Sequence, residues 1–596
     1  MNANREFCVK LIHCGNSSLA NPDDQCEKNI FFMPMGLFAL ASALQENGFD
    51  AEIIHSDCEG GKPIDQILAF PELDAVGFDC HWVNQSLAVL EAARVIKAIK
   101  PEVFVFLGGF TASLFAEEIL LAHPQIDAII RGDAELPIVT LCRALSADSP
   151  HDISGIPPAG KKSLSAVPNL VWRRDNDGIE INDFSYVATA EEMEKLDFAA
   201  IDLLRHRDYY RKRSIYWTRF APSNFAPLNL SPLFFLEVGR GCMNTCLFCG
   251  GNGEAQRLIN NRKGVVLRSA ASTIATIKKA MLFGFRTFFT DFECQGSDEW
   301  YRTLFQQLRR EQLDIRYVYS SWRLISNDIV DALSETFERA FIQLSPETAD
   351  VDLRRQNKGA AAFYTNDELK ACLDYIGAKG NLRAQLYFGY FLAFERPDTV
   401  LRTIEFILEL ILEYPELIEV AYLPFSTDPG SLLFLYPERY DITLDVRTFH
   451  DYLEKIRDTY VVEKLPCPDM RLFSPKGIPS QLAAELERRV ELFNHVFRAY
   501  RRSASSILQK TKSPEIILKL LDNSDVTAAH DLSEGIKETL LNVCESDGLL
   551  DPHLVRTIEE DHEIQKRRGQ QEFKSKPQIW LDCETGRGDS SGSAEE

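Results

Sequence analysis

The stretch Leu236-Glu-Val-Gly-Arg-Gly-Cys-Met-Asn-Thr-Cys-Leu-Phe-Cys-Gly-Gly251 carries three cysteines, Cys242, Cys246 and Cys249, in a CxxxCxxC spacing. An apolar run precedes it, which predicts that the cysteines lie in the loop after a β-strand. Gly250 and Gly251 follow directly, and glycine adds no side chain and tolerates positive φ. The loop can therefore fold tightly around a metal group and a bound ligand.

The cysteine spacing predicts an iron–sulfur site. Four thiolates would complete the coordination of a zinc ion or a [4Fe–4S] cube, whereas three leave one iron open to a ligand that is not protein. The alternatives are a structural zinc site with a distant fourth ligand, or three unrelated thiols. Zinc ribbons usually pair two CxxC hooks, and no second hook occurs, since Cys294, Cys372 and Cys467 stand alone.

Apolar runs alternate with helical patterns from residue 232 to 428. The expected strands are Phe234–Glu237, Thr287–Asp291, Arg316–Ser320, Phe341–Leu344, Arg383–Phe388 and Ile418–Leu423. Six βα units predict a partial (βα)6 barrel of the TIM type. The cysteines follow its first strand, and loops in that position form the catalytic face of such barrels.

Residues 1–145 show the same alternation. The expected strands are Phe7–Ile12, Ala51–Ile54, Ala75–Gly77, Val103–Leu107 and Ala128–Ile130, with helices at Met35–Asn47 and Leu87–Lys100 between them. This pattern predicts a Rossmann-like α/β domain with a doubly wound parallel sheet. Ligands of such sheets bind past the carboxyl ends of the strands.

The remaining segments do not repeat this alternation. Residues 146–231 are expected to be a linker with a hairpin at Asn169–Ile181, which turns at Asn176–Gly178. Residues 429–565 are helix-rich, with the clearest run at Gln481–Arg502, and residues 566–596 are expected to be a disordered tail.

Composition narrows the class of protein. The chain of 596 residues has a formal charge of -23, from 88 acidic and 65 basic side chains, which would repel a phosphate backbone and argues against nucleic acid as a partner. We find no apolar stretch long enough to cross a membrane and no apolar leader segment, so we expect a cytoplasmic protein without a membrane partner. Fourteen scattered cysteines do not resemble a secreted disulfide framework.

CxxxCxxC after the first strand of a βα barrel resembles the radical S-adenosylmethionine (SAM) superfamily. The Rossmann-like domain in front of it is similar to the cobalamin-binding branch of that superfamily, and the resemblance covers roughly residues 5–430. It implies a [4Fe–4S] cluster on the three cysteines, SAM at the open iron, and cleavage of SAM to a 5′-deoxyadenosyl radical. It also implies bound cobalamin and an electron donor such as flavodoxin or ferredoxin.

The resemblance also suggests which residues contact SAM: Gly250, Gly251, Asp291, Glu293, Ser321, Glu347 and Gln385. Glu347 follows the fourth strand, where a carboxylate can accept hydrogen bonds from an ammonium or from ribose hydroxyls. The alternative for Glu347 is a carboxylate at a helix N-terminus. Gln385 and Tyr387 share one face of the fifth strand, and they either reach into the site or fill the core.

Expected cobalamin contacts follow the third, fourth and fifth strands of the first domain: Cys80, His81, Gly108, Gly109, Thr111 and Gly132. Adjacent glycines at a strand end let backbone amides approach a flat or phosphate-bearing ligand. The D-x-H-x-x-G motif is absent after the first strand, and the near match Asp79–Asn84 ends in Asn and follows the third strand, so we treat the match as chance and expect bound cobalamin to lack a histidine from that motif. The alternative for the loop at 80–82 is a helix-capping loop with a partly buried aromatic residue.

The combination implies a cobalamin-dependent C-methyltransferase. Its substrate would be an unactivated carbon of a small-molecule or peptide natural-product precursor, and no catalytic residue can be named from the sequence. Members of the same branch also close rings and rearrange carbon skeletons, so a radical SAM cyclase or rearrangement catalyst is the second hypothesis. A metal-binding module without enzymatic activity is the third.

Overall fold

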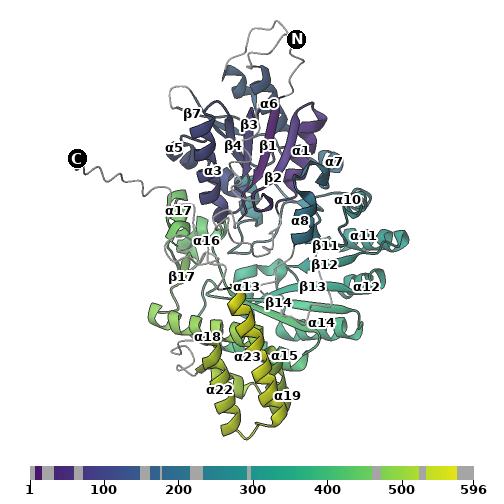
Figure 1. Ribbon diagram of the computed structural model, residues 1–596, viewed down its shortest axis with the longest axis vertical. Coiled ribbons are helices and arrows are strands. Elements are labelled where there is room, and N and C mark those ends of the chain that lie inside the picture. Colours follow the sequence, from purple (N-terminus) through teal and green to yellow (C-terminus); the bar gives the residue numbers. More distant parts are fainter. Residues whose placement is uncertain are drawn as a thin grey trace, which may run out of the picture.

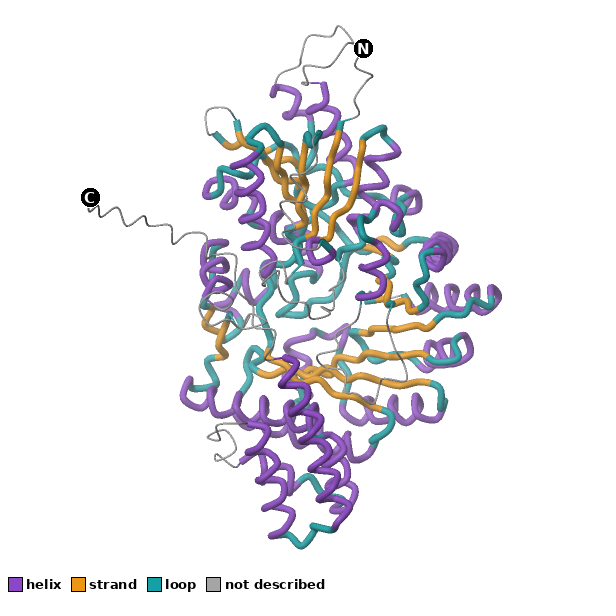
Figure 2. Tube along the Cα trace, viewed as in Figure 1, coloured by secondary structure: helices purple, strands orange, loops and turns teal. Residues whose placement is uncertain are grey.

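The computed structural model describes residues 7–15, 33–59, 72–147, 161–174, 178–214, 232–291, 297–458, 472–522 and 532–572. Two sheets and a bundle of helices follow one another along the long axis of the molecule (Figure 1). The strands of the first sheet run along that axis, and those of the second run across it (Figure 2).

The first sheet has seven strands in the order β2-β1-β3-β4-β5-β6-β7. They are β1 (Cys8–His13), β2 (Asp50–His55), β3 (Ala75–Asp79), β4 (Phe104–Gly108), β5 (Ala128–Ile130), β6 (Leu170–Arg173) and β7 (Ile179–Ile181). β1 to β5 pair in parallel, which confirms the doubly wound sheet. The predicted hairpin is β6 and β7, and β6 pairs antiparallel with β5, so the hairpin extends this sheet.

Helices cover both faces of this sheet: α1 (Gly36–Glu46), α3 (Ser86–Ile99), α4 (Phe110–Leu114), α5 (Ala116–Ala122) and α6 (Glu135–Ala147). Strands β1 and β3 are buried along their whole length, as expected for a sheet that is covered on both sides. Two short helices, α7 (Ala190–Lys195) and α8 (Arg207–Arg213), lie in the connection to the second sheet.

The second sheet has six parallel strands in the order β15-β14-β13-β12-β11-β8. They are β8 (Leu233–Phe235), β11 (Thr287–Thr290), β12 (Arg316–Ser321), β13 (Ala340–Glu347), β14 (Leu382–Tyr390) and β15 (Ile418–Pro424). The connecting helices are α10 (Ala270–Leu282), α11 (Asp298–Glu311), α12 (Asn327–Thr336), α13 (Val351–Lys358), α14 (Asn366–Ala378) and α15 (Pro397–Glu413). This succession confirms the partial (βα)6 barrel.

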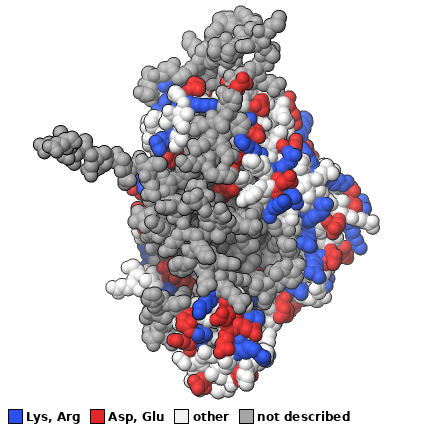
Figure 3. Space-filling model, viewed as in Figure 1, with Lys and Arg blue, Asp and Glu red and all other residues white. Residues whose placement is uncertain are grey.

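The loop after β8 has small elements of its own: β9 (Gly239–Arg240), α9 (Gly253–Ile259) and β10 (Val266–Leu267). On the face drawn in Figure 3, described acidic and basic side chains intermix over the barrel helices. Pairs such as Lys278 with Glu311 and Arg309 with Glu335 account for this mixture.

Beyond β15 the chain first returns to the first domain and then closes the barrel edge. The returning part contains α16 (Leu432–Leu435), β16 (Ile442–Leu444), α17 (Phe449–Arg457) and β17 (Phe473–Pro475). The ring of Phe449 packs 5.6 Å from that of Phe115 in the first domain, and its N–H donates to Glu118. This segment therefore ties the two domains together.

The C-terminal helices are α18 (Ser480–Ala499), α19 (Arg501–Thr511), α20 (Glu515–Asp522), α22 (Leu532–Ser546) and α23 (Pro552–Glu572). The run expected at Gln481–Arg502 breaks at Tyr500, whose hydroxyl donates to the Ser533 carbonyl. Helix α23 extends past residue 566, where the sequence predicts the tail to begin, and residues 573–596 lie outside the described residues. No helix in the described ranges has both the length and the apolar character needed to cross a membrane.

Candidate active site

A cavity of about 590 Å³ lies where the carboxyl ends of the two sheets face each other. From the first domain it is lined by His81, Gly108, Gly109 and Gly132, and from the barrel by Cys242, Cys249, Gly251 and Asp291. The structure therefore brings together residues that the sequence assigned to two different cofactors. In Figure 2 the loops between the two sheets converge on this region.

The cysteine loop is shaped by Asn252. Its side-chain oxygen accepts from the backbone N–H groups of Glu254 and Ala255, which caps α9. Its side-chain amide donates to the carbonyls of Cys249 and Cys246, at 2.8 and 3.3 Å. One buried asparagine therefore fixes both the turn between the cysteines and the start of the helix that follows.

Glycines allow the loop to pack against its neighbours. Gly241 has a φ of +94°, and a Cβ there would lie 2.1 Å from the Gly264 carbonyl oxygen. The N–H of Gly250 donates to Asp428, which follows β15, at 3.1 Å. Gly250 therefore anchors the loop to the far side of the barrel, whereas Gly251 faces the cavity.

The three thiols are enclosed to different degrees. Cys246 is buried and its Sγ donates to the Lys358 carbonyl at 3.8 Å, while Cys242 and Cys249 line the cavity. Burial raises the pKa of Cys246 to about 11, although the Lys358 ammonium opposes this. Burial also raises the pKa of Cys249 well above its ordinary value. Cationic iron must therefore stabilise the thiolates when the cysteines bind metal.

A search of the described residues finds no group of three or more His, Cys, Asp or Glu side chains close enough together to hold a single metal ion. Thiolates around a cube of four irons lie farther apart than those around one ion, because each binds a different corner.

Glu347 lies behind the cysteine loop rather than in the cavity. Its carboxylate is buried and lies 3.3 Å from the ammonium of Lys358, which also donates to the Ser345 carbonyl. Burial raises the pKa of Glu347, and Lys358 opposes the rise. The side chain that caps α13 is Asp350, so the helix-end alternative for Glu347 is wrong.

The other expected SAM contacts lie in different surroundings. Asp291 lines the cavity, and burial raises the pKa of its carboxyl to about 6 against a hydrogen bond from Ser320. Ser321 is buried and donates to the Arg323 carbonyl. Gln385 accepts from Gln343 and from the Tyr387 hydroxyl inside the barrel, at 3.0 and 2.8 Å. Glu293 lies outside the described residues.

On the opposite wall, two loops of the first sheet interlock. The N–H of Cys80 donates to the Gly108 carbonyl at 2.8 Å, and the Thr111 hydroxyl donates to the His81 carbonyl at 3.0 Å. Gly109 has a φ of +100°, and a Cβ there would lie 2.8 Å from the His81 Cα, so only glycine fits without strain. Cys80 and Thr111 are buried and shape this wall without lining the cavity.

His81 lines the cavity together with Trp82 and Phe110 from the same two loops. Its ring is partly exposed and packs 5.0 Å from Trp82 and 5.2 Å from Phe110, centroid to centroid. Burial lowers the pKa of His81 to about 4, although the Asp79 carboxylate opposes this, so the imidazole is neutral at physiological pH.

A charge network that the sequence analysis missed closes one side of the cavity. Asp133 and Glu135 of the first domain accept from Arg240 at 3.0 and 2.6 Å, and Asp133 also pairs with Arg262. Burial lowers the pKa of Arg240, but Glu135 and Asp133 more than compensate and hold it above its ordinary value. The partners are more than 100 residues apart in sequence, so no local pattern reveals them.

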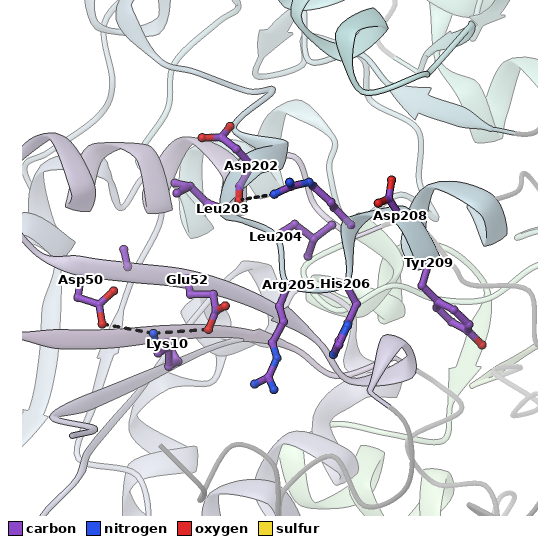
Figure 4. A pocket seen from close by; sticks show the side chains of 12 residues that line it. Lys10, Asp50, Glu52, Asp202, Leu203, Leu204, Arg205, His206, Asp208 and Tyr209 are labelled. Atoms are coloured by element: carbon purple, nitrogen blue, oxygen red, sulfur yellow. Dashed lines mark hydrogen bonds and ion pairs between the residues drawn. The ribbon is translucent and has the colours of Figure 1, made fainter. Parts of the chain in front are cut away.

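A second, open hollow of about 750 Å³ shares no lining residue with the cavity. Figure 4 shows Lys10 between Asp50 and Glu52, with Arg205 and His206 on the facing segment. Lys10 is buried and lies 3.5 Å from each of the two carboxylates. The charges here pair with one another, and the hollow lies away from the cysteine loop.

Comparisons with known proteins agree with this architecture of a Rossmann-like domain over a partial barrel with a cysteine loop. Residues 31–141 match the B12 binding domain family. This match, together with the relatives and solved structures that follow, supports the resemblance to radical SAM proteins that carry a cobalamin-binding domain.

The chain is 21% identical over 268 residues to the anaerobic magnesium-protoporphyrin IX monomethyl ester cyclase of Synechocystis sp., covering 42% of this chain and 46% of that protein. It is 25% identical over 235 residues to the hopanoid C-3 methylase of Methylococcus capsulatus, covering 39% of this chain and 38% of that protein. The chain thus spans less than half the length of these relatives.

Among solved structures, the fold is similar to that of TsrM from Kitasatospora setae, a radical SAM methyltransferase. The TM-score is 0.54 at 12% identity, over 80% of this chain and 85% of that one, in a structure with cobalamin and a [4Fe–4S] cluster bound. A second TsrM structure, with tryptophan substrate and a SAM analogue, gives a TM-score of 0.53 over 81% and 88%.

Proposed function

We propose that the chain is a cobalamin-dependent radical SAM enzyme, a C-methyltransferase that acts on an unactivated carbon of a small-molecule or peptide substrate. One observation carries the proposal: a single cavity is lined by the cysteine loop and by the strand-end loops of the B12-binding domain. The named activities of TsrM and of the hopanoid methylase support methyl transfer.

The residues present fit the implied cofactors. Three thiols lie on one loop, which leaves the fourth iron of a cluster open, and one of them, Cys246, is buried. Glycines on the opposite wall leave room for a flat ligand against the sheet edge. When bound, the cluster and SAM supply radical chemistry and cobalamin supplies the methyl group.

The chain's own residues would bind and orient the cofactors and enclose them in the cavity. Cys242, Cys246 and Cys249 hold the irons, and Lys358 places a positive charge behind Cys246. Asp291 reaches the cavity with a raised carboxyl pKa and is suited to accept a hydrogen bond from SAM.

The apolar walls of the cavity exclude water. Aromatic side chains from both domains, among them Phe110, Phe289 and Trp322, line it beside the polar groups. A dry cavity protects a reactive carbon centre from side reactions with solvent. The free thiols among the described cysteines support a reducing, cytoplasmic setting, in which a flavodoxin or ferredoxin is the electron donor.

A radical SAM cyclase is the second candidate. The observation that favours it is the similarity to the Synechocystis cyclase, whose match covers slightly more of this chain than that to the hopanoid methylase. The cavity geometry suits both reactions, because each needs SAM and a substrate carbon in one enclosed space.

The test is anaerobic reconstitution of the full chain with iron, sulfide and hydroxocobalamin, followed by incubation with SAM that carries an isotopic methyl label. We expect a brown protein that retains cobalamin, cleaves SAM and transfers the label to a candidate substrate. Retained cobalamin with SAM cleavage and ring closure but no transfer would favour the cyclase. A colourless protein that leaves SAM intact would refute both.

A further inference from the structure

Three histidines lie at the carboxyl edge of the first sheet, and they differ in what their rings contact. His13, at the end of β1, is buried and its Nδ1 lies 2.9 Å from Asp79. His55, at the end of β2, is fully buried and its Nδ1 accepts from the Asp57 N–H. The ring nitrogens of His81 make no hydrogen bond to the described residues, and His81 is one of the residues that line the cavity.

We propose that the imidazole of His81 is the protein's axial ligand to the cobalt of the bound cobalamin, on the corrin face that lies against the first sheet. The inference rests on the proposed function, because it requires cobalamin in the cavity. A neutral imidazole is a common ligand of transition metals, and a ligand must keep a lone pair uncommitted to another donor.

The backbone of His81 is held in place from three directions. Its carbonyl accepts from the Thr111 hydroxyl at 3.0 Å and from the Thr111 N–H at 3.3 Å. The carbonyl of the preceding residue, Cys80, accepts from Ala112 at 3.2 Å. Gly109 packs directly against the His81 Cα. These contacts hold the backbone of His81 against the sheet edge, beside the cavity that this residue lines.

The ring is oriented by packing. Trp82 and Phe110 meet the imidazole edge to face, at interplanar angles of 76° and 69°. Metal-bound histidines usually have a hydrogen-bonded partner for the second nitrogen. Here the Asp79 carboxylate bonds the ring of His13 instead of that of His81. The resemblance of Asp79-Cys-His81 to part of the D-x-H-x-x-G motif is therefore not evidence for the ligand.

Other side chains of this wall are poorer ligands. Trp82 has an indole N–H that only donates. Met33 and Met35 line the cavity as well, but Met33 is fully buried in the core, and thioethers prefer softer metals. Asp79 is already paired with His13. His81 is therefore the one nitrogen ligand among the described lining residues whose lone pair is available.

The experiment is electron paramagnetic resonance of the full chain loaded with cob(II)alamin, with the cluster kept in its oxidised, EPR-silent state and no SAM added. The protein is prepared with natural histidine and with histidine labelled with 15N. We expect each high-field cobalt line to split into a triplet from one axial nitrogen, and into a doublet in the labelled protein. The label separates a protein imidazole from the base of the cobalamin tail.

Two variants complete the test: His81→Gln, and His123→Gln as the control in the same domain and outside the cavity. We expect H81Q to retain cobalamin but to lose the nitrogen splitting, and H123Q to keep it. Three outcomes would overturn the ligand assignment while the proposed function stands. The parent protein could retain cobalamin without nitrogen splitting, the splitting could be the same with natural and with 15N-labelled histidine, or the splitting could persist in H81Q. A parent protein that binds no cobalamin would instead refute the cobalamin part of the proposed function, and the ligand assignment with it.

Discussion

Asp133 of the first domain and Arg240 of the barrel form an ion pair at 3.0 Å across the domain boundary, and both are largely buried. Arg240 stands two residues before Cys242, so this pair connects the B12-binding domain to the start of the cysteine loop. The carboxylate of Asp133 also accepts from Arg262 and from the Ala188 N–H. One carboxylate therefore ties the first domain to the segment that carries the cysteine loop.

Replacing Asp133 with Asn should destabilise the protein strongly. The change leaves Arg240 and Arg262 buried without their shared counter-charge, and breaking a buried pair in this way costs about 3–5 kcal/mol. We expect a lower midpoint in denaturant unfolding, followed by tryptophan fluorescence, and faster proteolysis between the domains. The control is Glu191→Gln, which removes an exposed pair with Lys195 and should leave the midpoint unchanged. Equal midpoints for D133N and the parent would show that the network does not hold the domains.

Much of the fold could be predicted from the sequence because the parallel strands are short, apolar and regularly spaced. The strand Ala128–Ile130 matches residue for residue, and the others differ by a few residues at their ends. The hairpin's place in the first sheet could not be predicted, since edge pairing of β6 with β5 depends on tertiary contacts.

For the site, the sequence identified the walls but not which side chains face the cavity. His81 and Asp291 line it, whereas Glu347 and Gln385 are committed to buried partners. Whether a side chain faces the cavity depends on its direction and on long-range ion pairs, and neither can be recognised from the neighbouring sequence. Lys358 illustrates the limit: the polar run Val351–Lys358 forms helix α13, yet the side chain of Lys358 is 1% exposed.

Replacing any one motif cysteine should abolish the cluster. For Cys246→Ala we expect loss of bound iron and sulfide and of the visible absorbance after anaerobic reconstitution, because two thiolates cannot hold the cube. The matched control is Cys372→Ala, since Cys372 is equally buried in the barrel but its Sγ only donates to the Ile325 carbonyl. Full iron content in C246A would disprove the ligand assignment.

Removing the buried charge behind the cluster should make the cluster harder to reduce. Lys358→Met keeps an unbranched side chain that is one atom shorter but withdraws a cation from beside Cys246 and Glu347, so the added electron loses a favourable interaction. We expect the reduction potential to shift negative by tens of millivolts, on the order that charges near a cluster produce. An EPR-monitored redox titration measures this shift. The control is Lys379→Met, which removes the cation that pairs with Asp331 at the barrel surface. An unchanged or more positive potential would contradict the electrostatic role.

Stability should fall as the pH rises through the neutral range. Burial raises the pKa of Glu395 from 4.5 to about 8, despite hydrogen bonds from the backbone at Leu392 and Phe391. The folded state therefore holds a proton that the unfolded chain releases near 4.5, so this contribution is complete below 4.5 and is lost as the pH rises through about 8. We expect Glu395→Gln to flatten the pH dependence of the thermal midpoint over that window. An identical slope in the variant would assign the dependence to other groups.

Replacing Gly109 with Ala should weaken cobalamin binding, because it would distort the two interlocked loops of the first sheet that line the cavity. The new Cβ would stand 2.8 Å from the His81 Cα, and the backbone at φ +100° and ψ 175° is a region that residues other than glycine enter at a cost of about 1–3 kcal/mol before any clash is counted. The Cys80–Gly108 and Thr111–His81 hydrogen bonds tie the loop after β3 to the loop after β4, so neither loop can shift without the other. We therefore expect weaker retention of cobalamin with normal iron content. Gly377→Ala is the control: a Cβ there makes ordinary contact at 3.4 Å inside helix α14, where Ala favours the helix by up to about 1 kcal/mol. Unchanged cobalamin binding in G109A would mean that the cofactor does not rest on this strand end. The cobalamin-binding surface would then lie elsewhere in the protein.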